Sequence, residues 1–136
     1  MKTGTIILIL FLIFSAISAG QSTDSVKVRS IPPAEFLTAS QNSGNALMID
    51  VREFFEYKKS RLKNAMNIPS MGNLDIAADT IKKDYDLFFY CTSGFRSKRV
   101  AKFFYQKGFL NVYSLDGGIV AWRKEKLPVD KKKVKR

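Results

Sequence analysis

The chain has 136 residues, with 23 lysines and arginines against 12 aspartates and glutamates, so its formal net charge is +11; it contains one cysteine and no histidine. Without histidine the sequence excludes a Ser-His-Asp relay, a histidine metal ligand and a Cys-His pair, and a single thiol excludes an internal disulfide and a four-cysteine zinc site. The length is that of one domain, and 46% hydrophobic residues are enough to form a core.

Residues 1–20 have the order of a secretory signal peptide. Lys2 supplies a positive start, residues 6–14 are an unbroken apolar run, and small residues follow up to Gly20. A membrane span needs about 20 apolar residues, which is longer than this run. We therefore expect residues 1–20 to be cleaved and the protein to be exported, periplasmic or secreted. The alternative is a protein tethered to the membrane by an uncleaved N-terminal segment.

Short apolar runs alternate with helix-forming segments over the rest of the chain. Residues 46–49 and 87–90 are continuous apolar runs, typical of strands buried on both faces. Predicted strands lie at 26–29, 46–49, 65–68, 87–90 and 112–115. One predicted helix begins at Pro32-Pro33, and four more cover 53–59 (with Phe54, Phe55 and Tyr57 inward), 73–78, 97–107 and 119–124. This alternation predicts an α/β fold with an open, mainly parallel sheet covered by helices on both faces.

Ligands of such sheets bind beyond the carboxyl ends of the strands, and two predicted strand ends carry reactive or charged residues. One is 50–52, with Asp50 and Arg52. The other is 91–97, Cys-Thr-Ser-Gly-Phe-Arg-Ser, which we call the Cys91 loop. A lone cysteine after an apolar strand is more often a buried core thiol than a nucleophile. Here, however, the neighbouring residues favour the nucleophile.

Gly94 allows the backbone of the Cys91 loop to bend, so that successive N–H groups turn inward. We expect Ser97 to cap the helix that follows. The N-terminus of a helix favours negative charge, and Arg96 adds a positive one. The sequence therefore predicts a Cys91 thiol that is shifted toward the thiolate without help from a histidine.

The Cys91 loop resembles the active-site loop of the rhodanese sulfurtransferases, whose common pattern is Cys-x-x-Gly-x-Arg-Ser. Further segments that resemble signatures of this family follow in the expected order: 49–53 with Glu56-Tyr57, 65–69, and 115–119 with Ala121-Trp122 and 127–129. The resemblance covers residues 24–130 and implies a single rhodanese-like domain, an open parallel sheet of five strands with helices on both faces, and a persulfide carried on Cys91. The chain departs from the family at 60–65, where two glycines and a histidine are missing, and 72–86 is short.

The resemblance implies a thiosulfate sulfurtransferase with Cys91 as the catalytic nucleophile. Cys91 would take sulfur from a small anionic donor, thiosulfate or polysulfide, and pass it to a thiol or cyanide without a metal or organic cofactor. Arg96 is the preferred donor contact, because a fork-shaped cation suits a sulfur oxyanion. The predicted substrate-binding residues are Thr92, Ser93, Gly94, Phe95, Arg96, Ser97 and Arg52, and the predicted supporting residues are Asp50, Gly117 and Gly118.

Some of these residues have a second interpretation that the sequence leaves open. Asp50 equally fits a cap of the helix at Glu53. Arg52 equally fits a surface ion pair. The two glycines at 117 and 118 fit simple turn geometry, although glycine there also permits a close approach to the Cys91 loop.

Two other functions are compatible with the sequence. A non-catalytic persulfide carrier or binding module of the cell envelope is the main alternative. A phosphatase or arsenate reductase is less favoured, because those loops carry five residues between Cys and Arg and this loop carries four.

Residues 131–136 form a basic tail that we expect to be solvated, with weak contact to anionic lipid as the alternative. We expect no nucleic-acid partner, and the sequence leaves the oligomeric state open.

Overall fold

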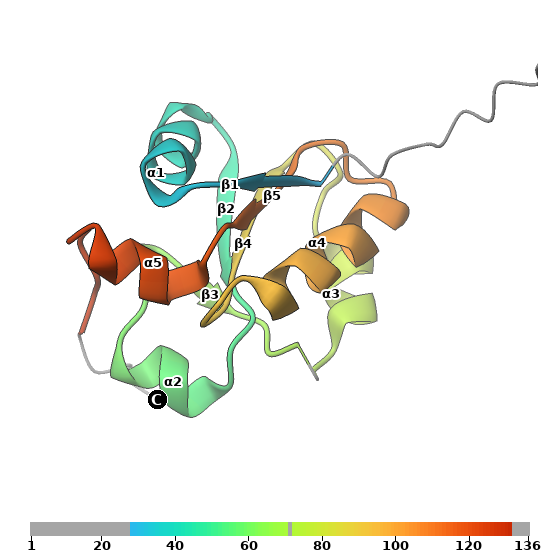
Figure 1. The fold of residues 1–136 in the computed structure, drawn as a ribbon. Coiled ribbons are helices and arrows are strands. Elements are labelled where there is room, and N and C mark those ends of the chain that lie inside the picture. Colours follow the sequence, from blue (N-terminus) through green and yellow to red (C-terminus); the bar gives the residue numbers. More distant parts are fainter. Residues whose placement is uncertain (1–27, 71, 132–136) are drawn as a thin grey trace, which may run out of the picture.

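A computed structural model of the protein describes residues 28–70 and 72–131 (Figure 1). The predicted signal peptide and all but the first residue of the predicted tail lie outside the described residues. The elements are β1 (Arg29–Ile31), α1 (Pro33–Asn42), β2 (Ala46–Asp50), α2 (Phe54–Lys59), β3 (Met66–Asn67), α3 (Leu74–Thr80), β4 (Asp86–Tyr90), α4 (Phe95–Gln106), β5 (Val112–Leu115) and α5 (Gly118–Lys124). None of the helices in these two ranges combines the length and the apolar character that crossing a membrane requires.

The five strands form one sheet in the order β1-β5-β4-β2-β3, and every neighbouring pair is parallel. The predicted α/β fold with a parallel sheet is confirmed. Because the strands are parallel, their carboxyl ends share one edge of the sheet. Asp50 is the register partner of Tyr90 there. The residues that follow β2 and β4 therefore lie next to each other.

Helices cover both faces of the sheet, and each face has its own core. Adjacent strand residues point to opposite faces, so Phe88 and Phe89 of β4 belong to different cores. Phe88 packs against Phe36 of α1, with ring centroids 5.3 Å apart, and the same core contains Trp122 of α5. Phe89 packs against Phe104 of α4 at 4.9 Å. In Figure 1, α1 and α5 accordingly lie on one side of the strands, and α3 and α4 on the other.

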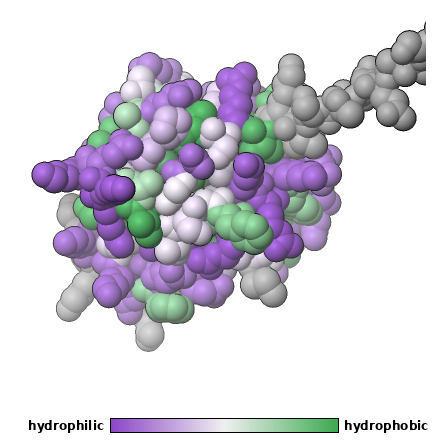
Figure 2. Space-filling model, in the orientation of Figure 1, coloured by the Kyte–Doolittle hydropathy of each residue, from purple (hydrophilic) through white to green (hydrophobic). Residues whose placement is uncertain are grey.

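The predicted inward orientation of Phe54 and Phe55 is wrong. Their exposed fractions are 50% and 73%, while Tyr57 is half-buried and its hydroxyl donates to the carbonyl of Ala65 at 2.8 Å. The helix α2 has only six residues and follows β2 beyond the end of the strand, so only one side of it meets the core. The face of the molecule seen in Figure 2 is mainly hydrophilic, with hydrophobic residues in small separate groups.

Several element boundaries differ from the predictions by a few residues. The first strand lies at Arg29–Ile31, so it meets the predicted range 26–29 only at Arg29. The helix predicted from Ser97 begins at Phe95, because Gly94 takes the capping position with φ +93°. Ser97 is therefore not the helix cap, and its amide is free for another contact described below.

Candidate active site

Cys91 follows the last residue of β4 and its side chain is buried at the base of the Cys91 loop. Its Sγ accepts hydrogen bonds from the backbone N–H groups of Gly94 at 3.2 Å and Ser97 at 3.4 Å. The positive φ of Gly94 turns its amide toward the sulfur, a conformation that is unfavourable for residues with a Cβ. The inward orientation of the N–H groups that the sequence predicts is present.

Two opposing effects act on the pKa of the Cys91 thiol. Burial raises it, because a charged sulfur loses hydration. Hydrogen bonds from the backbone and side chain of Ser97 and from the amides of Gly94 and Ser93 lower it, and these prevail, so the pKa lies below its ordinary value. The loop therefore favours the thiolate, the form of cysteine that acts as a nucleophile.

The N-terminus of α5 donates two hydrogen bonds to the Cys91 loop. The amide of Ile119 donates to the carbonyl of Cys91 at 2.9 Å, and that of Val120 donates to the carbonyl of Thr92 at 3.2 Å. A Cβ on Gly118 would lie 2.4 Å from the Thr92 oxygen, closer than any side chain can come. The close approach expected at the paired glycines is therefore present at Gly118, where the two loop carbonyls accept hydrogen bonds from the amides of α5.

Ser114 on β5 is a buried residue of the site that the sequence pattern does not predict. Its Oγ lies 3.0 Å from the Oγ of Ser97, and the Ser97 hydroxyl also lies 3.1 Å from the carbonyl of Gly94. These contacts tie the first turn of α4 to β5 and to the loop. The only signal in the sequence is one polar residue within an otherwise apolar strand.

Arg96 lies on the first turn of α4 and is linked to α2. Its Nη2 donates to the Thr92 hydroxyl at 3.2 Å and lies 3.7 Å from the carboxylate of Glu56. The Thr92 hydroxyl donates in turn to that carboxylate at 3.0 Å. Glu56 therefore forms an ion pair with Arg96, the cation that the sequence predicts to bind substrate.

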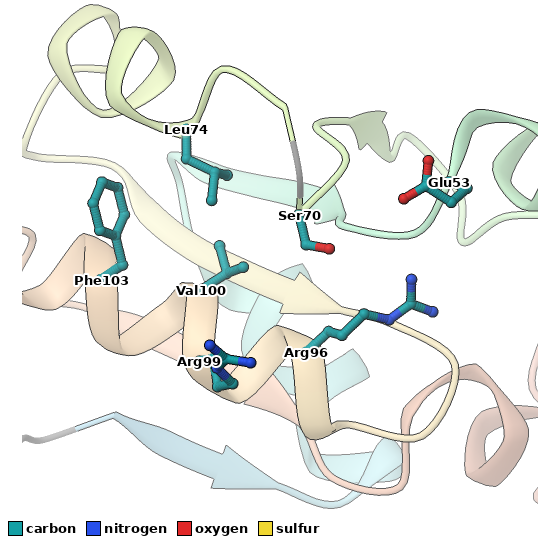
Figure 3. A pocket seen from close by; sticks show the side chains of 7 residues that line it. All are labelled: Glu53, Ser70, Leu74, Arg96, Arg99, Val100 and Phe103. Carbon is teal, nitrogen blue, oxygen red and sulfur yellow. The ribbon is translucent and has the colours of Figure 1, made fainter.

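An open cavity of about 410 Å³ lies beside the loop, between α4 and the segments around Ser70 and Leu74. Figure 3 shows Arg96 extending toward Glu53 at one end of this cavity, with Leu74 and Phe103 at the other end. Arg99 and Val100 line it as well. One end is therefore charged and the other apolar, and only Arg96 among these residues was predicted from the sequence.

Asp50 and Arg52 form a buried ion pair beside Tyr90. The Asp50 carboxylate accepts from the backbone amide, Nε and Nη2 of Arg52, with the shortest contact at 2.6 Å, and Nη2 also donates to the carbonyl of Ser60 at 2.7 Å. Burial raises the pKa of the Tyr90 phenol, and the nearby Asp50 carboxylate raises it further. The pair is buried rather than on the surface, and these bonds orient Arg52 toward Asp50 and Ser60. A substrate contact of Arg52 stays a prediction.

Asp50 does not cap α2, so that alternative is wrong. The N-terminus of α2 is closed by Glu53 and Glu56, whose side chains and amides form a capping box. The other predicted loop residues, Ser93 and Phe95, are exposed, Phe95 by 71% of its surface. Their roles toward substrate stay predictions. Within 28–70 and 72–131, no three residues among His, Cys, Asp and Glu come together as a metal site.

Comparison with known proteins places this geometry in a family. A family model described as "Rhodanese-like domain" matches residues 33–125. The chain belongs to the rhodanese-like family. A protein from Allochromatium vinosum named "Sulfurtransferase" is similar to this rhodanese-like chain, with 34% identity over 85 residues that cover 62% of the chain and 78% of the relative.

Longer proteins share the domain as well. A "tRNA uridine(34) hydroxylase" from Hamiltonella defensa is 34% identical over 94 residues, 62% of this chain and 26% of the relative, so the match spans about a quarter of that protein. Among solved structures, a rhodanese-related protein from Thermoplasma volcanium is similar with a TM-score of 0.67 and 30% identity, covering 76% of this chain and 99% of that one. The rhodanese-like fold is therefore shown by sequence and by structure.

Proposed function

We propose that this rhodanese-like protein is a sulfurtransferase that carries a sulfane sulfur as a persulfide on Cys91. The observation that carries the proposal is the pair of amides, those of Gly94 and Ser97, aimed at the Cys91 sulfur at 3.2 and 3.4 Å. Inward N–H groups of this kind stabilise negative charge on sulfur, which both the thiolate and the persulfide need. The similarity to a relative named "Sulfurtransferase" supports the same chemistry.

The first step loads the sulfur from a small anionic donor such as thiosulfate. The Cys91 thiolate attacks the outer sulfur, a new S–S bond forms, the S–S bond of thiosulfate breaks, and sulfite leaves with its electron pair. No proton has to move in this step, which suits a chain without histidine. Arg96 supplies the positive charge that attracts the donor.

The second step returns the enzyme to its starting state. A thiol or cyanide attacks the outer sulfur of the Cys91 persulfide, the S–S bond to Cys91 breaks, and the thiolate forms again. With cyanide the product is thiocyanate. The two half-reactions share one site, so ping-pong kinetics follow.

The longer relatives do not lead us to propose a tRNA substrate. The match covers about a quarter of the Hamiltonella defensa protein named "tRNA uridine(34) hydroxylase", and most of that protein has no counterpart in the match. The Cys91 loop itself requires only a donor small enough to reach a buried sulfur. The proposed partners are therefore a small anionic sulfur donor and a thiol or cyanide acceptor.

Intact mass spectrometry and a thiocyanate assay test the proposal. Thiosulfate should add one sulfur, about 32 Da, to the wild-type protein, and cyanide should remove it repeatedly with thiocyanate formed. Cys91→Ser should abolish both, because the chain contains one cysteine. Thiocyanate formation by Cys91→Ser at the wild-type rate would overturn the proposal. Sulfur uptake without turnover would favour the carrier alternative, and hydrolysis of an aryl phosphate would favour the phosphatase alternative.

A matched pair of variants on α4 tests the donor contact. Arg96→Gln should lower kcat/KM for thiosulfate by about tenfold to a hundredfold, the usual effect of losing a charge-assisted contact of about 1.5–3 kcal/mol. Lys98→Gln removes the same charge from an exposed position on the same helix and should have little effect. Equal losses in both variants would show that Arg96 acts only through overall charge.

A further inference from the structure

Three side chains, which we call the Glu56 bridge (Glu56, Thr92 and Arg96), join α2 to the Cys91 loop. The Glu56 carboxylate accepts from the Thr92 hydroxyl at 3.0 Å and lies 3.7 Å from Nη2 of Arg96, which itself donates to that hydroxyl at 3.2 Å. The carboxylate also accepts from the amide of Glu53 at 3.2 Å. Glu56 is therefore fixed at the start of α2 with its charge directed at Arg96.

The Glu56 bridge lies on the solvent side of the loop. The Cys91 side chain is buried, whereas the side chains of Arg96 and Glu56 are 36% and 24% exposed. A donor that approaches from solvent and uses Arg96 must therefore meet Glu56 as well. Thr92, next to the nucleophile in sequence, connects the two charges to the backbone of the loop.

The bridge changes the charge that a donor meets. Alone, Arg96 would present one unbalanced positive charge to an anion, but the Glu56 carboxylate balances it before any donor binds. A dianion such as thiosulfate must displace this carboxylate and is also repelled by it. An ion pair at this degree of exposure is weak enough for a donor to displace. The Glu56 carboxylate nevertheless repels anions, and it repels a dianion more strongly than a monoanion.

We propose that Glu56 sets the charge preference of this site, by competing with anionic donors for Arg96 and so favouring donors of lower charge over thiosulfate. The inference rests on the proposed sulfur transfer through Cys91, and it adds a specificity-determining residue on α2. Glu56 neither reacts with nor touches the sulfur. It acts through Arg96 and through its own charge.

Alkylation of Cys91 tests this inference without requiring sulfur transfer. Iodoacetate and iodoacetamide are similar in size and differ by one negative charge, and the chain has one thiol for them to react with. Glu56→Gln keeps the shape and the capping hydrogen bonds, since glutamine also serves in a capping box. We expect it to raise the ratio of the iodoacetate rate to the iodoacetamide rate by about three- to tenfold. Glu56→Ala should raise the ratio in the same direction.

A control variant separates local from overall charge. Asp84→Asn also turns a carboxylate into an amide. Asp84 is exposed and precedes the amino end of β4, whereas Cys91 follows the carboxyl end of the same strand. The alkylation ratio should stay at the wild-type value in this variant. A ratio unchanged in Glu56→Gln and Glu56→Ala, or raised as much in Asp84→Asn, would overturn the inference.

Donor kinetics then test the preference itself. Thiosulfate and methanethiosulfonate transfer the same sulfur but carry two and one negative charges. Glu56→Gln should lower KM for thiosulfate by about three- to tenfold and KM for methanethiosulfonate by less. A higher KM or an equal effect on both donors would show that Glu56 is only structural. Absence of sulfur uptake by the wild-type protein from either donor would instead refute the proposed function, while the alkylation ratio would still decide the role of Glu56.

Discussion

Replacing Gly118 with alanine tests whether the contact between α5 and the Cys91 loop builds the site. Gly118 has φ +61°, and a Cβ there would lie 2.4 Å from the Thr92 carbonyl oxygen and 2.6 Å from that of Cys91. A backbone carbonyl cannot swing aside as a flexible side chain does. The loop and α5 must therefore separate by about 1 Å to reach ordinary contact at 3.4 Å. This separation lengthens the hydrogen bonds that Ile119 and Val120 donate to the loop carbonyls.

The expected loss of stability follows from these two effects. The left-handed backbone costs alanine about 1–2 kcal/mol, and two weakened backbone hydrogen bonds contribute about 0.5–1.5 kcal/mol each. We therefore expect Gly118→Ala to lower the free energy of unfolding by about 2–5 kcal/mol. Gly108 is the matched control, because it has φ +95° and no atom within 4 Å of a Cβ. Gly108→Ala should cost only the conformational part, about 1–2 kcal/mol.

Urea unfolding measures both free energies, and iodoacetamide measures the loop. Misaligned amides stabilise the thiolate less, so the midpoint of the pH profile of Cys91 alkylation should move upward in Gly118→Ala. It should stay in place in Gly108→Ala. Equal destabilisation by the two variants, or an unchanged midpoint in Gly118→Ala, would refute the view that this contact shapes the loop.

Two further predictions concern pH and α2. The pKa of Cys91 is lowered in the folded protein, so ionisation of the thiol stabilises the fold. The difference in free energy of unfolding between the wild type and Cys91→Ser should therefore rise as the pH passes the pKa of Cys91 in the folded protein. It should level off above 9.0, the ordinary pKa value of the thiol. Urea titrations at several pH values measure this difference. A difference that falls with pH would contradict this sign. Phe55 is exposed, so Phe55→Ser should change stability by less than about 0.5 kcal/mol, whereas Phe36→Ala should cost about 3–5 kcal/mol in the same assay; comparable losses would show that Phe55 packs.

The sequence was informative where a local pattern determines the structure. The apolar runs at 46–49 and 87–90 became β2 and β4, because strands buried on both faces need no alternation of polar residues. The spacing within the Cys91 loop predicted its inward amides, because Gly94 supplies the backbone turn. These features depend on residues that are neighbours in the chain.

The features that sequence reasoning missed depend on distant contacts. The pattern of α2 suggested that Phe54 and Phe55 point inward, but it contains no information on where the sheet ends. Ser114 meets Ser97 across 17 residues, and Glu56 meets Thr92 across 36 residues. Periodicity describes which residues share a face of one element. It does not show which element from elsewhere in the chain that face will meet.

The order of the strands has a consequence for the synthesis of the protein. Arg29 of β1 pairs with Tyr113 of β5, a separation of 84 residues, so β1 has no neighbour in the sheet until β5, the last of the five strands, has left the ribosome. Joining such distant segments carries a large loop-closure entropy and makes folding slow. Until β5 arrives, β4 is an edge strand, exposed to pairing with other chains. The amides of α5 emerge later still, so a nascent chain displays its only thiol before the support for the surrounding loop has been made.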